Sequence, residues 1–167
     1  MTNNNAELSG LAGPLGRAIA YIWAEAEILD RKDYAGWAAL WAEDGKYIVP
    51  IEHGTDDYAG RLNYVYDDAR MRRLRVERLS SGHSMSAADA AKTVRTVSRF
   101  RLVSEAGGVV EVNSSQVVVG YKRGKHTLYA ADLTHRIDLA GETPRLLQKV
   151  IRLVNAEDSL SAIGFLL

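Results

Sequence analysis

The sequence contains no cysteine. Without thiols the chain cannot form disulfides, zinc fingers or cysteine-ligated iron–sulfur clusters, and it has no thiol nucleophile. It also lacks a G-x-G-x-x-G turn, a P-loop and a G-x-S-x-G elbow, the usual signatures of nucleotide binding and of serine hydrolases. No H-E-x-x-H or similar pair is present, so we interpret the histidines as loop or sheet residues rather than metal ligands: His53, His83, His126 and His135.

An excess of either charge is absent as well. Lys plus Arg number 21 and Asp plus Glu number 21, so the formal net charge is zero. Nucleic-acid binders usually carry a basic excess, because phosphate neutralisation supplies most of their affinity. No apolar run approaches the ~20 residues of a membrane-spanning helix, and residues 1–10 lack the pattern of a signal peptide. The sequence therefore predicts a cytoplasmic protein that contacts neither nucleic acid nor membrane.

The length and composition suit one globular domain. The chain has 167 residues, of which 47% are hydrophobic and 25% are charged. These values are typical of a water-soluble domain with one core. We expect a flexible tail over residues 1–12, followed by a single domain over residues 13–167.

The first half of the sequence has the spacing of helices. Pro14 is a typical first helical residue, and apolar residues recur at steps of three and four up to Asp30. A second, short helix follows, and Gly45 stands where a left-handed C-terminal cap is usual. Residues 46–50 then form a predicted strand and residues 51–64 a predicted loop.

The second half has the pattern of a sheet. β-branched residues alternate with polar ones, and glycine-bearing turns separate the runs. This predicts five strands, in residues 93–104, 109–122, 127–139, 145–154 and 160–166. In the third run, one face carries Tyr129, Ala131, Leu133, His135, Ile137 and Leu139. Helices followed by such strands predict an α+β fold, in which N-terminal helices pack into a long, curved, mainly antiparallel sheet.

Between the two halves, residues 66–79 contain five arginines and are predicted to form a helix. At 100° per residue these side chains spread around much of the helix, so some must approach other protein groups. Arginine suits carboxylates and carbonyls at partly dry interfaces. With acidic neighbours and no net charge, a subunit interface is favoured over nucleic acid for the set Arg70, Arg72, Arg73, Arg75 and Arg78.

One acid–base site is conceivable. Asp30 ends the first predicted helix, where a concave sheet would place it near a pocket mouth. Together with Tyr47 or His83 it could act as a general acid–base pair if an apolar cavity raised its pKa. The aromatic stripe of Tyr34, Trp37 and Trp41 favours core packing over a ligand platform.

Four segments resemble the small (beta) subunit of aromatic-ring-hydroxylating, Rieske-type non-haem iron dioxygenases. They are EAEILDRKDYAGWAALWAEDGKYIVP, YVYDDARMRRLRVERL, TVRTVSRFRL and LLQKVIRLVNAEDSLSAIGFLL. The first matches the family's run at Glu25, Leu29, Asp30, Trp37, Asp44, Tyr47 and Pro50. The second matches its helix at Asp67, Asp68, Arg75, Val76, Arg78 and Leu79. The resemblance extends from about Tyr21 to Leu167.

The resemblance implies a cone-shaped α+β fold of the nuclear transport factor 2-like superfamily, shared with scytalone dehydratase and ketosteroid isomerase. It further implies a non-catalytic subunit without a cofactor that forms a trimer and docks on three large (alpha) subunits. Those large subunits carry the Rieske [2Fe-2S] cluster and the mononuclear iron. Trimer formation would bury half-polar strand residues such as His135 and Arg136 beside neighbouring chains.

The superfamily also contains free-standing enzymes, so a second hypothesis stays open. It is a lyase or isomerase that uses Asp30 with Tyr47 or His83. The interior of the cone distinguishes the two hypotheses. An open cavity lined by those groups favours an enzyme, whereas an interior filled by Trp37, Trp41 and Tyr47 favours the structural subunit.

Overall fold

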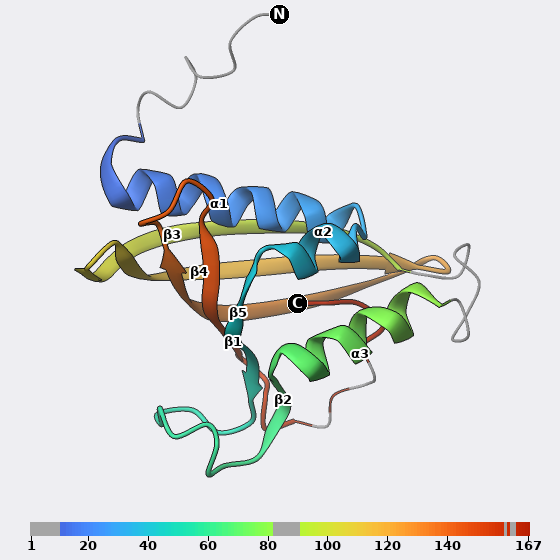
Figure 1. The fold of residues 1–167 in the computed structure, drawn as a ribbon. Helices are drawn as coiled ribbons and strands as arrows, with labels where there is room; N and C mark the ends of the chain where they lie inside the picture. Colours follow the sequence, from blue (N-terminus) through green and yellow to red (C-terminus); the bar gives the residue numbers. More distant parts are fainter. Residues whose placement is uncertain (1–10, 82–90, 159, 161–162) are drawn as a thin grey trace, which may run out of the picture.

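The computed structural model describes residues 11–81, 91–158, 160 and 163–167. The predicted tail lies outside the described residues except for Leu11 and Ala12, and His83 lies outside them too. Three helices lie against one face of a curved, six-stranded sheet (Figure 1). This α+β architecture confirms the predicted fold class. None of the described helices is long and apolar enough to cross a membrane.

Helix α1 (Gly13–Asp30) begins at a proline in its first turn, as predicted. Its buried stripe of Ala18, Ile22 and Leu29 packs on the sheet and contributes to the main hydrophobic core. The same stripe contains Glu25, an acidic residue that is only 2% exposed. Helix α1 therefore places one carboxylate inside the core.

Helix α2 (Tyr34–Ala39) starts where the Asp33 side chain accepts a hydrogen bond from Gly36 N. The prediction that Gly45 caps this helix is wrong, because the helix ends at Ala39 and Gly45 lies inside strand β1 (Trp41–Pro50). A side chain at Gly45 would place its Cβ 2.8 Å from the Leu146 carbonyl oxygen. The glycine is thus required by close strand packing rather than by a left-handed cap.

Strand β2 (Asn63–Asp67) occupies residues that were predicted as loop and helix. It pairs antiparallel with β1, and helix α3 (Ala69–Ser80) starts two residues after it. The Asp68 carboxylate accepts a hydrogen bond from Met71 N and caps the helix. The strand was missed in the sequence because its five residues, next to polar turns, are too few to show a clear alternation of apolar and polar side chains.

The other four strands are β3 (Lys92–Ala106), β4 (Val109–Lys122), β5 (Lys125–Asp138) and β6 (Arg145–Leu153). The strand order is β2-β1-β6-β5-β4-β3. Every pair is antiparallel except β1 with β6, which is parallel. The residues that alternation placed on one face of β5 include Leu133, His135 and Ile137, and these three are at most 2% exposed.

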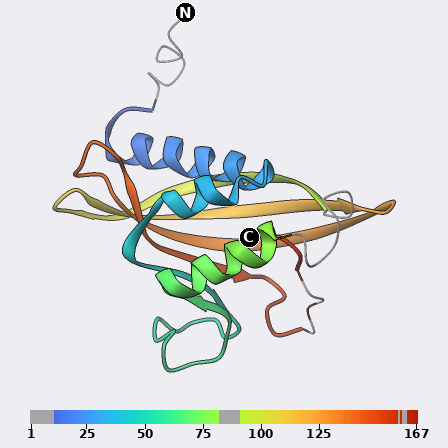
Figure 2. The same ribbon diagram turned by 45° about the vertical axis from the view of Figure 1, so that its right-hand side comes forward.

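The fifth predicted strand, residues 160–166, is wrong for its described part. Residue 160 and residues 163–167 are not in a strand. Both sides of β6 are already occupied, by β1 and β5, so no sheet edge is free beside it. Instead the last residues run into the fold and end near α3 in both ribbon views (Figures 1 and 2). Leu166 and Leu167 are buried there, at 2% and 4% exposure.

Candidate functional site

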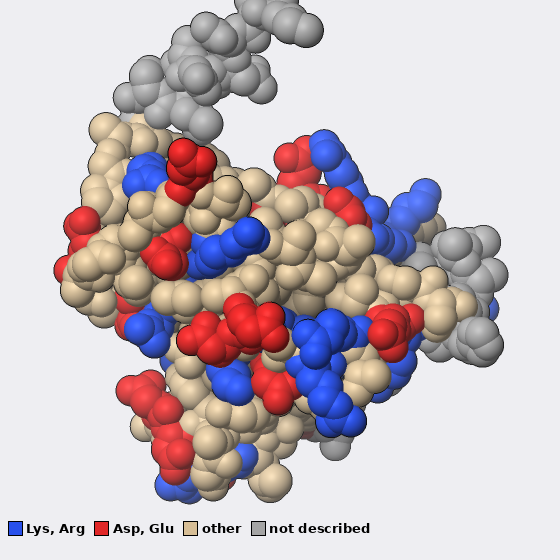
Figure 3. All heavy atoms as spheres, viewed as in Figure 1, with Lys and Arg blue, Asp and Glu red and all other residues tan. Residues whose placement is uncertain are grey.

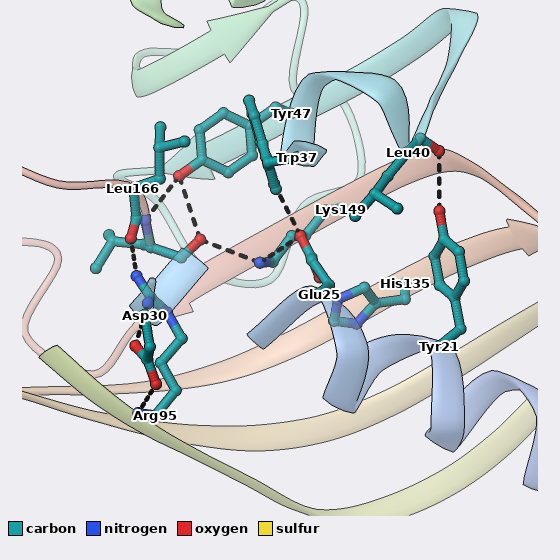
Figure 4. Close-up of polar contacts among 11 residues, drawn as sticks. Tyr21, Glu25, Asp30, Trp37, Leu40, Tyr47, Arg95, His135, Lys149 and Leu166 are labelled. Carbon is teal, nitrogen blue, oxygen red and sulfur yellow. Dashed lines mark hydrogen bonds and ion pairs between the residues drawn. The ribbon is translucent and has the colours of Figure 1, made fainter. Parts of the chain in front are cut away.

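A buried polar network lies between α1 and the sheet (Figure 4). Its centre is Glu25, whose Oε1 accepts hydrogen bonds from Trp37 Nε1 and from Lys149 Nζ, each at 3.0 Å. Glu25 Oε2 lies 3.2 Å from His135 Nε2. All of these side chains are buried, at 2% exposure or less. Elements from both ends of the chain therefore meet at one carboxylate.

The charges of this network decide its protonation. Burial alone would raise the pKa of Glu25, but the Lys149 ammonium and the His135 contact outweigh it and hold that pKa well below its usual value. Burial lowers the pKa of His135, despite the neighbouring carboxylate. A neutral ring with its hydrogen on Nε2 also fits the geometry, because His135 Nδ1 is buried without a hydrogen-bond partner among the described residues. The network thus holds a Glu25–Lys149 ion pair next to a neutral histidine.

A second group of contacts ties residues 166 and 167 to the same region. Lys149 Nζ donates to Leu167 O at 3.1 Å, and Leu167 N donates to the Tyr47 hydroxyl at 3.1 Å. Arg95 donates through Nη2 to Leu166 O and through Nη1 to Asp30. Residues 166 and 167 are not in a strand. These side chains therefore supply the hydrogen-bond partners that their main-chain groups need.

The interior around these groups is filled. The rings of Trp37, Trp41 and Tyr47 contact one another edge to face, with centroids 5.3 to 6.1 Å apart. Two hollows in the described part of the chain lie elsewhere. One, of about 690 Å³, is on the outer face of the sheet next to Tyr58 and Arg136, and the other borders Met71 and Leu74 on α3.

The proposed acid–base residues are engaged in structural contacts. Asp30 accepts hydrogen bonds from Thr93 Oγ1 at 2.9 Å and from Arg95 N at 2.8 Å, besides its ion pair with Arg95. Burial raises the pKa of Tyr47 to about 12, and its hydroxyl bonds to Leu167 rather than to Asp30. His83 lies outside the described residues. The described geometry therefore assembles no free acid–base pair.

The arginines of α3 divide into two groups. Arg72 is 5% exposed, donates to the carbonyls of Gly45 and Ala42, and stacks on the Trp41 ring at 4.5 Å. Arg75 makes a two-bond ion pair with Asp67. Both make contacts within the chain itself. The other three arginines of the helix are exposed: Arg70, Arg73 and Arg78.

The space-filling view shows the surface setting of this helix. Basic side chains gather over α3, with acidic side chains directly beside them (Figure 3). The two strand residues that were predicted to lie at a subunit interface also differ in exposure. His135 is 0% exposed and contacts Glu25 within the chain. Arg136 is exposed on the outer face of the sheet, 3.9 Å from Glu111.

Sequence reasoning did not identify Glu25, Arg95 or Lys149 as members of one site. The available signal was a charged residue at a position that periodicity assigns to the core: Glu25 lies in the stripe of α1, and Lys149 in an apolar strand. Such residues need a buried partner. The partner of Glu25 lies 124 residues away, however, and no local pattern identifies it. Among the described residues no group of three histidine or acidic side chains is arranged to hold a metal ion.

The arrangement of three helices on one face of a curved sheet is shared with known structures. The chain superposes with a TM-score of 0.53 and 15% identity on a crystal structure from Novosphingobium aromaticivorans described as an NTF2-like protein with a cystatin-like fold, covering 80% of this chain and 77% of that one. The beta subunit of the benzoate 1,2-dioxygenase from Burkholderia mallei fits better, with a TM-score of 0.75 and 21% identity over 89% of this chain and 95% of that one. These likenesses establish the fold.

Sequence comparison is more specific. Residues 24–157 match the family model of the ring hydroxylating beta subunit, and the chain belongs to this family. One relative is the beta subunit of benzene 1,2-dioxygenase from Pseudomonas putida, 34% identical over 107 residues. That match covers 59% of this chain and 57% of the relative, so it spans little more than half of the relative's length.

Proposed function

We propose that this protein is a non-catalytic beta subunit of an aromatic-ring-hydroxylating dioxygenase, and that it supports assembly of the large alpha subunit that dihydroxylates an aromatic compound. Family membership supports this proposal. The observation that carries it is the packed interior: the rings of Trp37, Trp41 and Tyr47 contact one another edge to face, and Leu166 and Leu167 are buried in the same hydrophobic core. The protein acts as a component of an oxidoreductase without performing the chemistry.

The cofactors belong to the partner in this proposal. A Rieske [2Fe-2S] cluster needs two cysteines and two histidines, and this sequence contains no cysteine. The alpha subunit supplies the Rieske cluster and the mononuclear iron. The beta subunit supplies a rigid body whose outer surfaces contact neighbouring chains.

The proposed assembly is a trimer of beta subunits that docks on three alpha subunits, a hexamer in the cytoplasm. The exposed arginines of α3 and Arg136 on the sheet are the proposed contacts. Exposed apolar residues on the outer strands support a chain-covered surface, because Val94 is 67% and Leu128 is 64% exposed. The two lie on β3 and β5, on opposite sides of β4, whose Val119 pairs with each of them.

Co-expression with a candidate alpha subunit tests the proposal. We expect a stable hetero-oligomer by native mass spectrometry, with iron and turnover found only when the alpha subunit is present. The double variant Arg70→Glu/Arg73→Glu is expected to weaken assembly at least tenfold while leaving the unfolding midpoint of the isolated chain unchanged. Arg31→Glu is the matched control, since this arginine is also exposed and its ion pair is with Glu27 of the same helix. Failure to bind any alpha subunit, or turnover by the isolated chain that is lost in Asp30→Asn, would reject the proposal.

A further inference from the structure

Side chains on the outer face of the sheet line up in rows across β3, β4 and β5, because directly paired residues of antiparallel strands point to the same side. Two successive rows contain no charged residue: Val94, Val119 and Leu128, then Thr96, Val117 and Ala130. Val154 extends the second row, since its N–H donates to Ala130 O at 3.0 Å. The outer face therefore carries one continuous apolar patch.

This patch is open in the described part of the chain. Val154 is 69% exposed, a value close to those of Val94 and Leu128. The described helices lie against the other face of the sheet, so none of them covers the patch (Figure 1). Soluble monomers seldom expose continuous apolar surface of this kind, and where it occurs it commonly marks a contact with another molecule.

The margins of the patch are polar. The row on one side consists of Lys92, Tyr121 and His126. The row on the other side ends at Asp132, which forms an ion pair with Arg99. An apolar centre with a charged and polar rim is the arrangement found in protein–protein interfaces.

Tyr121 gives this margin a prominent contact residue. Its side chain is 44% exposed, and its ring lies against the His126 ring with 4.9 Å between the centroids. Tyrosine is enriched among the residues that contribute most to binding between proteins. A ring already held by a neighbour loses little freedom when it binds.

The shape and charge of this face favour a second copy of the chain as its partner. A sheet face rich in β-branched residues packs well on another sheet face about 10 Å away, and a second copy supplies such a face. The rim carries both signs of charge, on Lys92 and Arg99 and on Asp132, so a copy does not meet a surface of one sign. Contacts between identical chains also tend to be more apolar than contacts between different proteins.

The exposed surface of α3 differs in position and composition. Helix α3 lies on the opposite side of the sheet, and its exposed arginines give it a polar surface. One neighbouring chain of ordinary size does not cover both surfaces. The two surfaces therefore suit two different partners.

We propose that the apolar patch on the outer sheet face binds other copies of this chain, and that the alpha subunit binds elsewhere on it. The contact residues are Val94, Val117, Tyr121, Leu128 and Val154. This inference rests on the proposed function, which calls for a trimer of beta subunits, and it names the surface that forms the trimer.

Sedimentation velocity of the isolated full chain, over a wide range of protein concentrations, tests the proposal. The natural chain is expected to self-associate. Leu128→Asp is expected to weaken self-association by about a hundredfold or more, because a carboxylate without a partner would be buried in an apolar contact. Leu62→Asp is the matched control, since Leu62 is 74% exposed but lies in the loop between β1 and β2.

Two measurements separate folding from association. Thermal unfolding at a concentration where the chain is a single copy is expected to give the same midpoint for Leu128→Asp and the natural chain. Leu128→Thr keeps a side chain suited to a strand and provides a milder change, expected to weaken self-association by about tenfold.

The proposal is overturned if the natural chain stays a single copy at every concentration, or if Leu128→Asp associates as tightly as Leu62→Asp. It is also overturned if Leu128→Asp loses binding to a co-expressed alpha subunit while its self-association is intact, because the patch would then belong to the alpha subunit. Absence of alpha binding by the natural chain would reject the proposed function instead, and it would leave the self-association of the isolated chain as measured.

Discussion

The ion pairs on the two faces of the sheet differ in their exposure to solvent. On the inner face, Glu25 and Lys149 meet at 3.0 Å inside the core, and each is at most 2% exposed. On the outer face, Arg99 and Asp132 form an ion pair whose side chains are 70% and 63% exposed. The inner pair is shielded from solvent, whereas water and salt screen the outer pair.

This difference separates structural residues from surface residues. A buried charge must have a partner in the correct geometry, or the fold loses several kcal/mol. An exposed pair contributes about 0–1 kcal/mol, so its residues can change with little effect on the fold. The outer face is therefore free to be adapted to neighbouring chains, while the inner face is constrained by the fold itself.

The largest expected effect comes from breaking the inner pair. Glu25→Gln removes the charge that Lys149 faces, and we expect a loss of about 3 kcal/mol in the free energy of unfolding. Urea unfolding at neutral pH measures it. Glu27→Gln is the matched control on the same helix, since Glu27 is exposed and pairs with exposed Arg31. A similar loss in both variants would contradict the assigned role of the inner pair.

An effect of similar size is expected from removing an apolar side chain on the inner face of one strand, but not on its outer face. Leu133 on β5 is 2% exposed, whereas Leu128 on the same strand is 64% exposed. Leu133→Ala is expected to cost about 2–5 kcal/mol through lost burial and a cavity. Leu128→Ala is expected to change the isolated chain by less than about 0.5 kcal/mol. Thermal unfolding of the two variants checks this contrast. Equal losses in the free energy of unfolding would mean that Leu128 is packed against other residues of the same chain.

The smallest effect concerns pH. Burial lowers the pKa of His135 in the folded chain below its unfolded value of about 6.5. Between these two values the unfolded state binds a proton that the folded state does not, so stability falls as the pH is lowered through this window. We expect a slope of up to about 1.4 kcal/mol per pH unit between pH 6.5 and 5.

Urea unfolding at several pH values measures this slope. The window stays above the unfolded pKa of glutamate, about 4.3, so the contribution of Glu25 is constant within it. His135→Gln should flatten the slope, whereas His126→Gln should leave it unchanged because His126 is exposed. A slope that persists in His135→Gln would assign the titration to another group.

Local pattern predicted the elements with long periodic runs. Helix α1 and strands β3 to β6 follow the expected ranges closely, because nine or more residues of strand or helix pattern average out single exceptions. Short elements were missed or misplaced. Strand β2 has five residues, and Gly45 has a role that depends on the approach of Leu146, which lies 101 positions later in the sequence.

The candidate site was predicted only in its parts. Glu25, Asp30, Trp37 and Tyr47 all belong to the segment that resembles the beta subunits, and all four lie in the interior contacts. Their roles differ from those considered from the sequence, since Asp30 and Tyr47 hold Arg95 and Leu167 rather than a substrate. Alternation placed His135 on the same face as Leu133 and Ile137, and all three are buried.

The sequence by itself determined which residues turn inward, because side-chain direction follows from helical and strand geometry that each segment carries locally. It also determined that no cysteine-based cofactor resides in this chain. Only the tertiary structure decided which charges meet: Glu25 with Lys149, and Asp30 with Arg95, 124 and 65 residues apart. The reason is physical. A buried ion pair depends on a distance and a dielectric environment that exist only after the sheet has closed around the helices.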